Sequence, residues 1–222
     1  MVGMFIVVTF IIFLIIDVVV LKMQNKPHPA FGTITAANLL VFNDYNFDIP
    51  DNLMFSRSHT WLQSNDKGLI KIGVDDFVGK AIGAYSFSSF AGVDRDIKRG
   101  DTIFEISSGN RSIKIPSPID CTLKSVNEGV LAKTNLSPYQ DWGVQVKPKN
   151  NEDNLRHLIY SKDAAAWMKN EVKRLKGFMK GTLQQADIAG LTMYDGGTAV
   201  KSVITILTDK EFQNFQKEFL TL

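Results

Sequence analysis

The chain has 222 residues, of which 45% are hydrophobic and 10% aromatic, and its formal net charge is +2. This composition excludes an intrinsically disordered chain, and so small a charge excludes a histone-like protein that binds polyanions. One Cys cannot form an internal disulfide, and with only three scattered His the sequence has no ligand cluster of the structural-zinc type. We therefore expect no metal site.

Residues 1–21 predict a transmembrane helix, because 18 of these 21 residues are apolar. Between Met4 and Leu21 the only polar residues are Thr9 and Asp17, and at about 1.5 Å per residue such a helix nearly crosses the hydrocarbon layer. A cleaved signal peptide is not indicated, because no basic residue precedes the segment and no pair of small residues follows it. We expect an uncleaved membrane anchor.

The charges beside this segment predict its orientation. Lys22 and Lys26 follow the segment and no basic residue precedes it, so the positive-inside rule places the N-terminus outside and the rest of the chain in the cytoplasm. We therefore expect a single-pass protein of the cytoplasmic membrane. The lone Cys121 is compatible with the reducing environment of the cytoplasm. Asp17 has two interpretations of equal weight: it reaches the membrane interface, or it makes a polar contact with a partner helix.

Residues 22–55 predict a linker that packs on the following domain. Pro27 and Pro29 prevent the membrane helix from continuing, but residues 36–47 are too apolar for a free tether. Beyond the linker, short runs of alternating apolar and polar residues separated by turn residues predict small antiparallel strands. These predicted strands span residues 59–63, 68–74, 84–90, 102–107, 112–115, 121–126 and 142–147.

Helices are predicted in three places. Asp75 is the expected cap of a short helix that Gly83 ends. Residues 154–179 have helical spacing, and the net charge of +3 over residues 152–180 suits a solvated helix face or, less commonly, a contact with anionic lipid. In the extension 181–222, Thr208 and Glu211 predict a capping box, and the apolar stripe of this last helix is expected to pack on its own domain rather than in a partner's groove.

Short motifs follow one another in a distinctive order along residues 56–180. They are His59-Thr60-Trp61, Gly73 to Gly83, Val93 to Asp101, Ser117 to Asp120, Val126-Asn127-Glu128, Pro138-Tyr139 with Trp142, and Lys147-Pro148. In this order they resemble the motifs of the H protein of the glycine cleavage system. The resemblance implies a mainly β fold with α-helices, a lipoyl/biotinyl-like flattened β-barrel with C-terminal helices, preceded here by the N-terminal transmembrane helix.

The resemblance also locates the site of the family's lipoyl group. In H proteins a lysine at a hairpin tip carries lipoyl through an amide bond, and counting back from Ser117-Pro118 places that position at Asn110. A carboxamide cannot replace the nucleophilic amine that forms this bond, so we expect no cofactor. Gly109-Asn110 suits a tight hairpin, because both residues tolerate positive φ. Lys114 is an alternative attachment site, but it is predicted to lie on the returning strand and point outward.

Cys121 stands where the family has a glycine. No basic residues surround it in the sequence, so we expect a small buried side chain rather than a redox thiol.

These features lead to three functional hypotheses. The first is a membrane-anchored, non-lipoylated H-protein-like domain that acts as a non-catalytic interaction module or accessory subunit of a membrane complex, with Ser108, Gly109, Asn110 and Arg111 as its contact surface. The second is a lipoyl carrier of one-carbon metabolism modified at a non-standard lysine. The third is an efflux-adaptor-like membrane fusion protein, although such adaptors insert a long helical hairpin at the domain tip and here the tip is short.

Other classes of function have no support in the sequence. The motifs G-x-S-x-G and H-E-x-x-H and a glycine-rich phosphate loop are all absent, so we do not expect an enzyme. Basic residues are not interleaved with aromatic residues along a strand, so we do not expect nucleic-acid binding.

Overall fold

The computed structural model describes Thr9, Phe13 and residues 47, 49–131, 133, 136–149, 153–185, 203–205 and 207–222. Within these residues no helix combines the length and apolar character needed to span a bilayer. Thr9 and Phe13, both helical, are the only described residues of the predicted transmembrane segment. The rest of that segment, including Asp17, and nearly all of the predicted linker lie outside the described residues, so the anchor stays a prediction.

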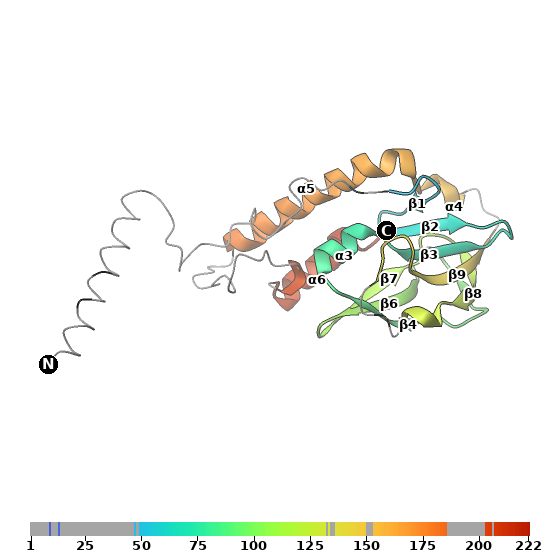
Figure 1. Ribbon diagram of the computed structural model, residues 1–222, viewed down its shortest axis with the longest axis horizontal. Coiled ribbons are helices and arrows are strands. Elements are labelled where there is room, and N and C mark those ends of the chain that lie inside the picture. The colour runs from blue at the N-terminus through green and yellow to red at the C-terminus, as the bar shows by residue number, and fades with distance from the viewer. Residues whose placement is uncertain are drawn as a thin grey trace.

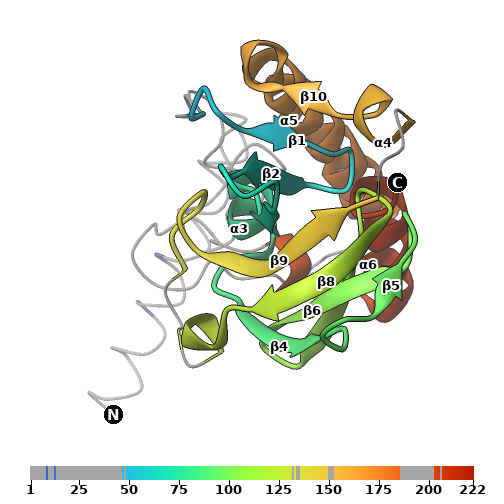
Figure 2. The same ribbon diagram turned by 90° about the vertical axis from the view of Figure 1, so that its right-hand side faces the viewer.

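The described strands form two antiparallel sheets that pack against each other (Figures 1 and 2). The larger sheet has the strand order β10-β1-β2-β3-β9-β8-β5 and the smaller has the order β4-β6-β7. The bounds of the strands are β1 (Met54–Phe55), β2 (Thr60–Ser64), β3 (Ile70–Val74), β4 (Ser86–Phe90), β5 (Asp96–Ile97), β6 (Thr102–Ser108), β7 (Arg111–Pro116), β8 (Cys121–Val126), β9 (Trp142–Pro148) and β10 (Ile159–Tyr160).

All seven predicted strands are confirmed, with ends that differ by one or two residues. The strands β1, β5 and β10 were not predicted, because each has two residues and so shows no alternation that a sequence pattern can reveal. The alternation within the longer strands places one set of side chains between the sheets. Ile113 and Ile115 of β7 are fully buried, for example, while Lys114 between them is exposed.

One close approach inside the larger sheet requires glycine. A Cβ atom at Gly73 of β3 would lie 2.6 Å from the indole ring of Trp61, its partner on β2. Residue 73 must therefore be glycine, because the buried indole of Trp61 occupies the space that a side chain at this position would need.

The predicted short helix is α3 (Asp76–Ile82), and both of its predicted ends are confirmed. Oδ1 of Asp75 accepts a hydrogen bond from the amide of Val78 at 3.3 Å, and Gly83 ends the helix with φ +79°. Two short 3-10 helices are η2 (Glu128–Val130) and η3 (Val203–Thr205), of which η3 lies beside α3.

The helical pattern predicted over residues 154–179 is interrupted at Ile159–Tyr160. The structure has a single turn α4 (Asp153–Arg156), then β10, and then the long helix α5 (Ser161–Gln185). Ile159 pairs with Phe55 of β1, and Tyr160 pairs with Met54. Because the edge of β1 offers unpaired backbone groups, sheet hydrogen bonds replace helical ones at this point. The same pairing makes the end of the predicted linker, Met54–Phe55, part of the sheet.

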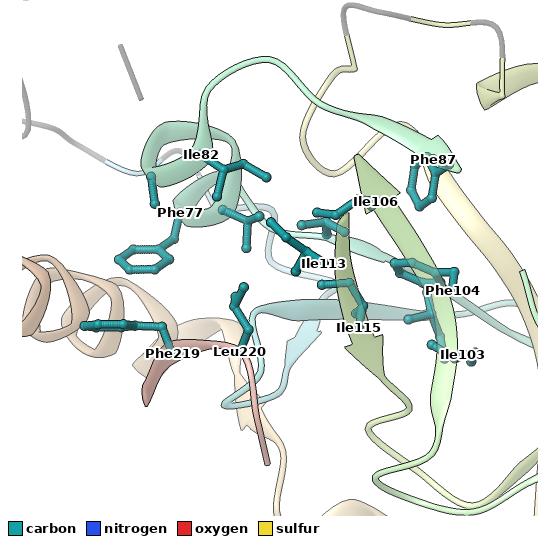
Figure 3. Close-up of a cluster of buried hydrophobic side chains, with 14 of the residues drawn as sticks. Phe77, Ile82, Phe87, Ile103, Phe104, Ile106, Ile113, Ile115, Phe219 and Leu220 are labelled. Carbon is teal, nitrogen blue, oxygen red and sulfur yellow. The ribbon is translucent and has the colours of Figure 1, made fainter. Parts of the chain in front are cut away.

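The last helix, α6 (Asp209–Phe219), covers the end of the domain beside α3 (Figure 1). Its predicted capping box of Thr208 and Glu211 is confirmed. The predicted packing of its apolar stripe on its own domain is also confirmed, because Phe212, Phe215, Phe219 and Leu220 are buried in the main core. Figure 3 shows Phe219 next to Phe77 of α3, with ring centroids 5.9 Å apart.

If α6 is an integral part of the core, truncating its buried ring will destabilise the whole domain. For Phe219→Ala we expect the free energy of unfolding to fall by about 3–5 kcal/mol, because the substitution removes a fully buried aromatic ring and leaves a cavity. Urea unfolding followed by tryptophan fluorescence measures this loss. The matched control is Gln213→Ala, an exposed position on the same helix, and an equal urea midpoint in the two variants would contradict the prediction.

Candidate functional site

The β6–β7 hairpin carries the position at which the sequence predicts the missing lipoyl-lysine. The last pair of its register joins Ser108 to Arg111, so Gly109 and Asn110 form the two-residue loop. Gly109 has φ +60°, whereas Asn110 is not among the described residues with positive φ. The predicted tight hairpin at Gly109-Asn110 is confirmed, with positive φ at Gly109. Positive φ at the first loop residue alone is the pattern of a type II′ turn, in which glycine takes the first place.

Asn110 lies exposed at the hairpin tip, as predicted. Lys114 lies well back from the tip, exposed on β7 opposite Glu105 of β6. Its backbone is held in the sheet between two buried isoleucines, so this lysine cannot move out to the tip. The tip itself offers a carboxamide and no amine, and the residues present do not fit an amide-linked lipoyl group.

One side of the hairpin tip is fastened to the end of α3. The hydroxyl of Ser108 donates hydrogen bonds to two main-chain carbonyls, that of Ile82 at 3.1 Å and that of Ala84 at 2.8 Å. Both carbonyls belong to the segment in which α3 ends. Ser108 therefore ties the tip to a helix that is itself part of the core.

The other side of the tip is fastened to the start of α6 through Arg111. Its Nη2 donates a hydrogen bond to the carbonyl of Leu207, and its guanidinium lies 4.4 Å from the ring centroid of Phe212. Asp209 adds an ion pair at 3.8 Å, but this carboxylate is fully exposed and such pairs contribute little. Only 16% of the Arg111 side chain is exposed. The carbonyl hydrogen bond and the cation–π contact thus account for most of the attachment.

The four residues predicted as a contact surface therefore divide into two kinds. Gly109 and Asn110 are exposed to solvent, whereas the Ser108 hydroxyl and Nη2 of Arg111 donate hydrogen bonds within the chain. These internal contacts join segments more than twenty residues apart for Ser108 and 96 residues apart for Arg111, so no local pattern could have revealed them.

Cys121 is fully buried, as predicted for a small side chain in place of the family's glycine. Burial raises the pKa of its thiol to about 11, although a contact with the Ser117 hydroxyl at 3.7 Å acts in the opposite direction. At neutral pH this cysteine is a protonated thiol and is not reactive.

The sequence analysis missed a buried charged cluster around His59. The imidazole is fully buried and lies between the rings of Phe77 and Trp167, with centroids 4.0 and 4.9 Å away. Its Nδ1 lies 2.8 Å from Oδ2 of Asp75, and its Nε2 lies 3.8 Å from Oε2 of Glu171. The second distance is that of an ion pair, not of a hydrogen bond. His59 is thus placed between two carboxylates.

The cluster continues from Glu171 to α6. Arg174 donates to both carboxylate oxygens of Glu171, at 2.9 and 2.6 Å. The same guanidinium donates to the main-chain carbonyl of Glu218 at 3.2 Å and lies 5.1 Å from the ring centroid of Phe219. The cluster therefore joins β2, α3, α5 and α6, four segments that the sequence separates widely.

The electrostatics of the cluster favour charged His59 and charged Glu171. Burial alone lowers the pKa of His59, but the charge and hydrogen bond of Asp75, together with Glu171, outweigh it and raise this pKa above 6.5. Burial alone raises the pKa of Glu171, but His59 and Arg174 outweigh it and lower this pKa below 4.5. A fully buried imidazole has no access to a substrate, so the cluster is a structural element and not a catalytic one.

Two further expectations concern metals and the membrane. No group of three or more His, Cys, Asp or Glu among the described residues could hold a metal ion. Asp17 lies outside the described residues, so its two interpretations stay open.

The two small antiparallel sheets, the tight hairpin and the covering helices define a mainly β domain of the flattened-barrel type. The Glycine cleavage H-protein family matches residues 53–171, which is 119 of 222 residues, and the chain belongs to this family.

Individual relatives agree with this assignment. A protein named "Probable glycine cleavage system H protein" from Pyrococcus furiosus is 27% identical over 126 residues, which cover 55% of this chain and 94% of the relative. The "Glycine cleavage system H protein" from Paraburkholderia phymatum is 26% identical over 125 residues, covering 55% of this chain and 96% of the relative. A crystal structure of a glycine cleavage system H protein from Mycobacterium marinum has 18% sequence identity and a TM-score of 0.48. The match covers 55% of this chain and 99% of that chain.

The His59 cluster predicts a defined dependence of stability on pH. A raised histidine pKa stabilises the fold fully below pH 6.5, and this contribution is lost as pH rises through the folded-state pKa. A lowered glutamate pKa stabilises the fold above pH 4.5, and this contribution is lost as pH falls through the folded-state pKa. The contribution of the cluster is therefore largest between pH 4.5 and 6.5.

His59→Asn tests this dependence, because asparagine tolerates the left-handed backbone that His59 adopts with φ +59°. The urea midpoint, measured from pH 5 to 9, should be lower for the variant than for the wild type at the acid end. The difference between the two proteins should shrink as pH rises above neutrality. A difference that stays constant over the whole range would contradict a charged His59.

Proposed function

We propose that this chain is an H-protein-family domain without lipoyl that acts as a non-catalytic interaction module of a membrane complex, held at the cytoplasmic membrane by residues 1–21. The observation that carries the proposal is Asn110 at the exposed tip of the β6–β7 hairpin, where the family has its lipoyl-lysine. Without an amine at this position, the tip has no nucleophile to which a lipoyl group could be joined.

The fastening of the tip supports a contact surface rather than a mobile attachment point. Ser108 holds the tip to the end of α3, and Arg111 holds it to the start of α6. A surface whose side chains are already ordered loses less conformational entropy when a partner binds. Gly109 and Asn110 are the solvent-exposed residues of this ordered tip.

The partner in this proposal is a protein, because relatives of this chain are named as proteins of the glycine cleavage system. Such a system has other protein components. A domain that has the family fold without the lysine can still have the surface that binds those components. The anchor adds a membrane setting, for which the apolar composition of residues 1–21 is the support.

A second candidate function is a lipoyl carrier, which the names of the relatives favour. It requires attachment at another lysine, of which Lys114 is nearest to the tip. The exposure of Lys114 agrees with this candidate, but its position within the β6–β7 ladder places it on the strand and not at the hairpin tip. The same chemical measurement decides between the two candidates.

That measurement is the intact mass of the full chain, extracted with detergent from the membrane fraction of its native host. We expect the mass of the unmodified sequence, because no amine is present at the tip. Lys114→Arg should change the mass only by the difference between arginine and lysine. An added lipoyl group in the wild-type protein, lost in Lys114→Arg, would overturn the proposal in favour of the second candidate.

The contact surface can be tested with a cross-linker at the tip. Cys121 is buried with a pKa of about 11, so a thiol introduced by Asn110→Cys is the reactive one at neutral pH. Labelled with a maleimide photo-cross-linker in native membranes, this variant should give one discrete adduct. Lys67→Cys, exposed on the β2–β3 turn, is the matched control. Equal adducts from both positions, or none from position 110, would contradict a partner at the tip.

A further inference from the structure

A second site lies at the other end of the domain from the hairpin tip. A cavity of about 380 Å³ opens there, lined among others by Arg57, Arg99, Pro118, Arg156, His157 and Leu222. These residues come from the β1–β2 turn, the β5–β6 turn, the β7–β8 loop, the link from α4 to β10, and the end of the chain after α6. Figure 2 shows that the C-terminal end lies beside α4 on this side of the molecule. The fold thus gathers basic residues from segments far apart in sequence.

The charge of this cavity is one-sided. Three arginines and a histidine line it, and no Asp or Glu is among its lining residues. The carboxylate of Asp120, two residues after Pro118, accepts a hydrogen bond from the main-chain amide of Arg99 at 2.7 Å. The site therefore concentrates positive charge on a chain whose formal net charge is only +2.

Two of these guanidiniums lack the carboxylate partners that other cations of the domain have. Lys124, Lys149 and Arg174 all form ion pairs with carboxylates. For the side chains of Arg57 and Arg99, no ion pair is found anywhere in the described part of the chain. Guanidinium groups that face a shared cavity repel one another, so an anion between them would be stabilised.

The backbone that carries these arginines is held in place by buried contacts. Arg57 lies between Ser56 and Ser58, which are buried and share a hydrogen bond of 2.8 Å between their hydroxyls. Since both neighbours point inward, the side chain of Arg57 is left at the surface. Arg99 is fixed by its bond to Asp120, in a turn closed by Lys98 and Asp101. The backbone positions of the two arginines are therefore set before any ligand arrives.

We propose that this arginine pocket binds a phosphate group carried by an organic molecule. Arginine matches phosphate because its planar guanidinium donates two parallel hydrogen bonds to two oxygens of one phosphate. The cavity is larger than a phosphate ion, and Pro118, Leu158 and Leu222 give it apolar walls that suit an organic portion. The phosphate belongs either to a soluble phosphate ester or to a lipid headgroup. This inference is independent of the proposed role of the hairpin tip.

The test uses the full chain in a neutral detergent and isothermal titration calorimetry with three probes. These are the soluble phosphate ester glycerol 3-phosphate, dihexanoyl phosphatidic acid and, as the neutral-headgroup comparison, dihexanoyl phosphatidylcholine. We expect binding of the first or second probe, weakened at least tenfold by Arg57→Ala and by Arg99→Ala, because each removes charge-assisted hydrogen bonds. Binding should also weaken as salt is added.

The outcomes separate the two sources of phosphate. Tighter binding of glycerol 3-phosphate identifies a soluble ester as the ligand class, and tighter binding of the phosphatidic acid identifies a lipid headgroup. Lys124→Ala, which removes an exposed lysine outside the pocket, should bind like the wild type. All variants should keep the wild-type urea midpoint, because the substituted side chains are exposed. No binding of either phosphate probe at millimolar concentration, or unchanged binding by both arginine variants, overturns the proposal.

Discussion

The burial of α6 against α3 and the β6–β7 hairpin is the contact on which the rest of the structure depends. The two sheets enclose a core whose α3 end is not closed by any strand, and Phe77 and Ile82 of α3 lie there (Figure 3). Phe219 and Leu220 cover this end, and both are almost completely buried. A stripe of aromatic side chains on one helix supplies enough apolar area to complete a core of this size. The helix α6 is thus an integral part of the domain's hydrophobic core.

The sequence predicted the parts of the fold that local patterns control. Alternation of apolar residues gave the seven longer strands, and the capping chemistry of Asp75 and Thr208 gave the starts of two helices. The strand β10 between α4 and α5 was missed, because helical spacing continues through Ile159 and only the edge of β1 selects the extended form there. Tertiary hydrogen bonds decided this segment against its local pattern.

The candidate sites were predictable to different degrees for the same reason. Asn110 could be located because it lies at a fixed offset from Ser117-Pro118 and beside a glycine that suits the turn. The contacts of Arg111 within the chain could not be predicted, because its partners Leu207 and Phe212 are about a hundred residues away. His59 was noticed only as part of a motif, since its partner Glu171 lies on α5. The arginine pocket likewise unites four separate loops, and each arginine alone is an ordinary surface residue.

The loss of the lysine and the position of α6 are physically connected. A carrier needs a tip whose attached group can leave the domain, whereas Arg111 and Ser108 hold this tip against two helices. Because α6 begins beside the tip and the chain after it ends at the arginine pocket, one rigid helix of roughly 16 Å fixes both places. The helix can do so only while Phe215 and Phe219 stay buried. Because the start of α6 is fastened to this tip, movement of the tip would cost part of the stability that the buried rings of α6 supply.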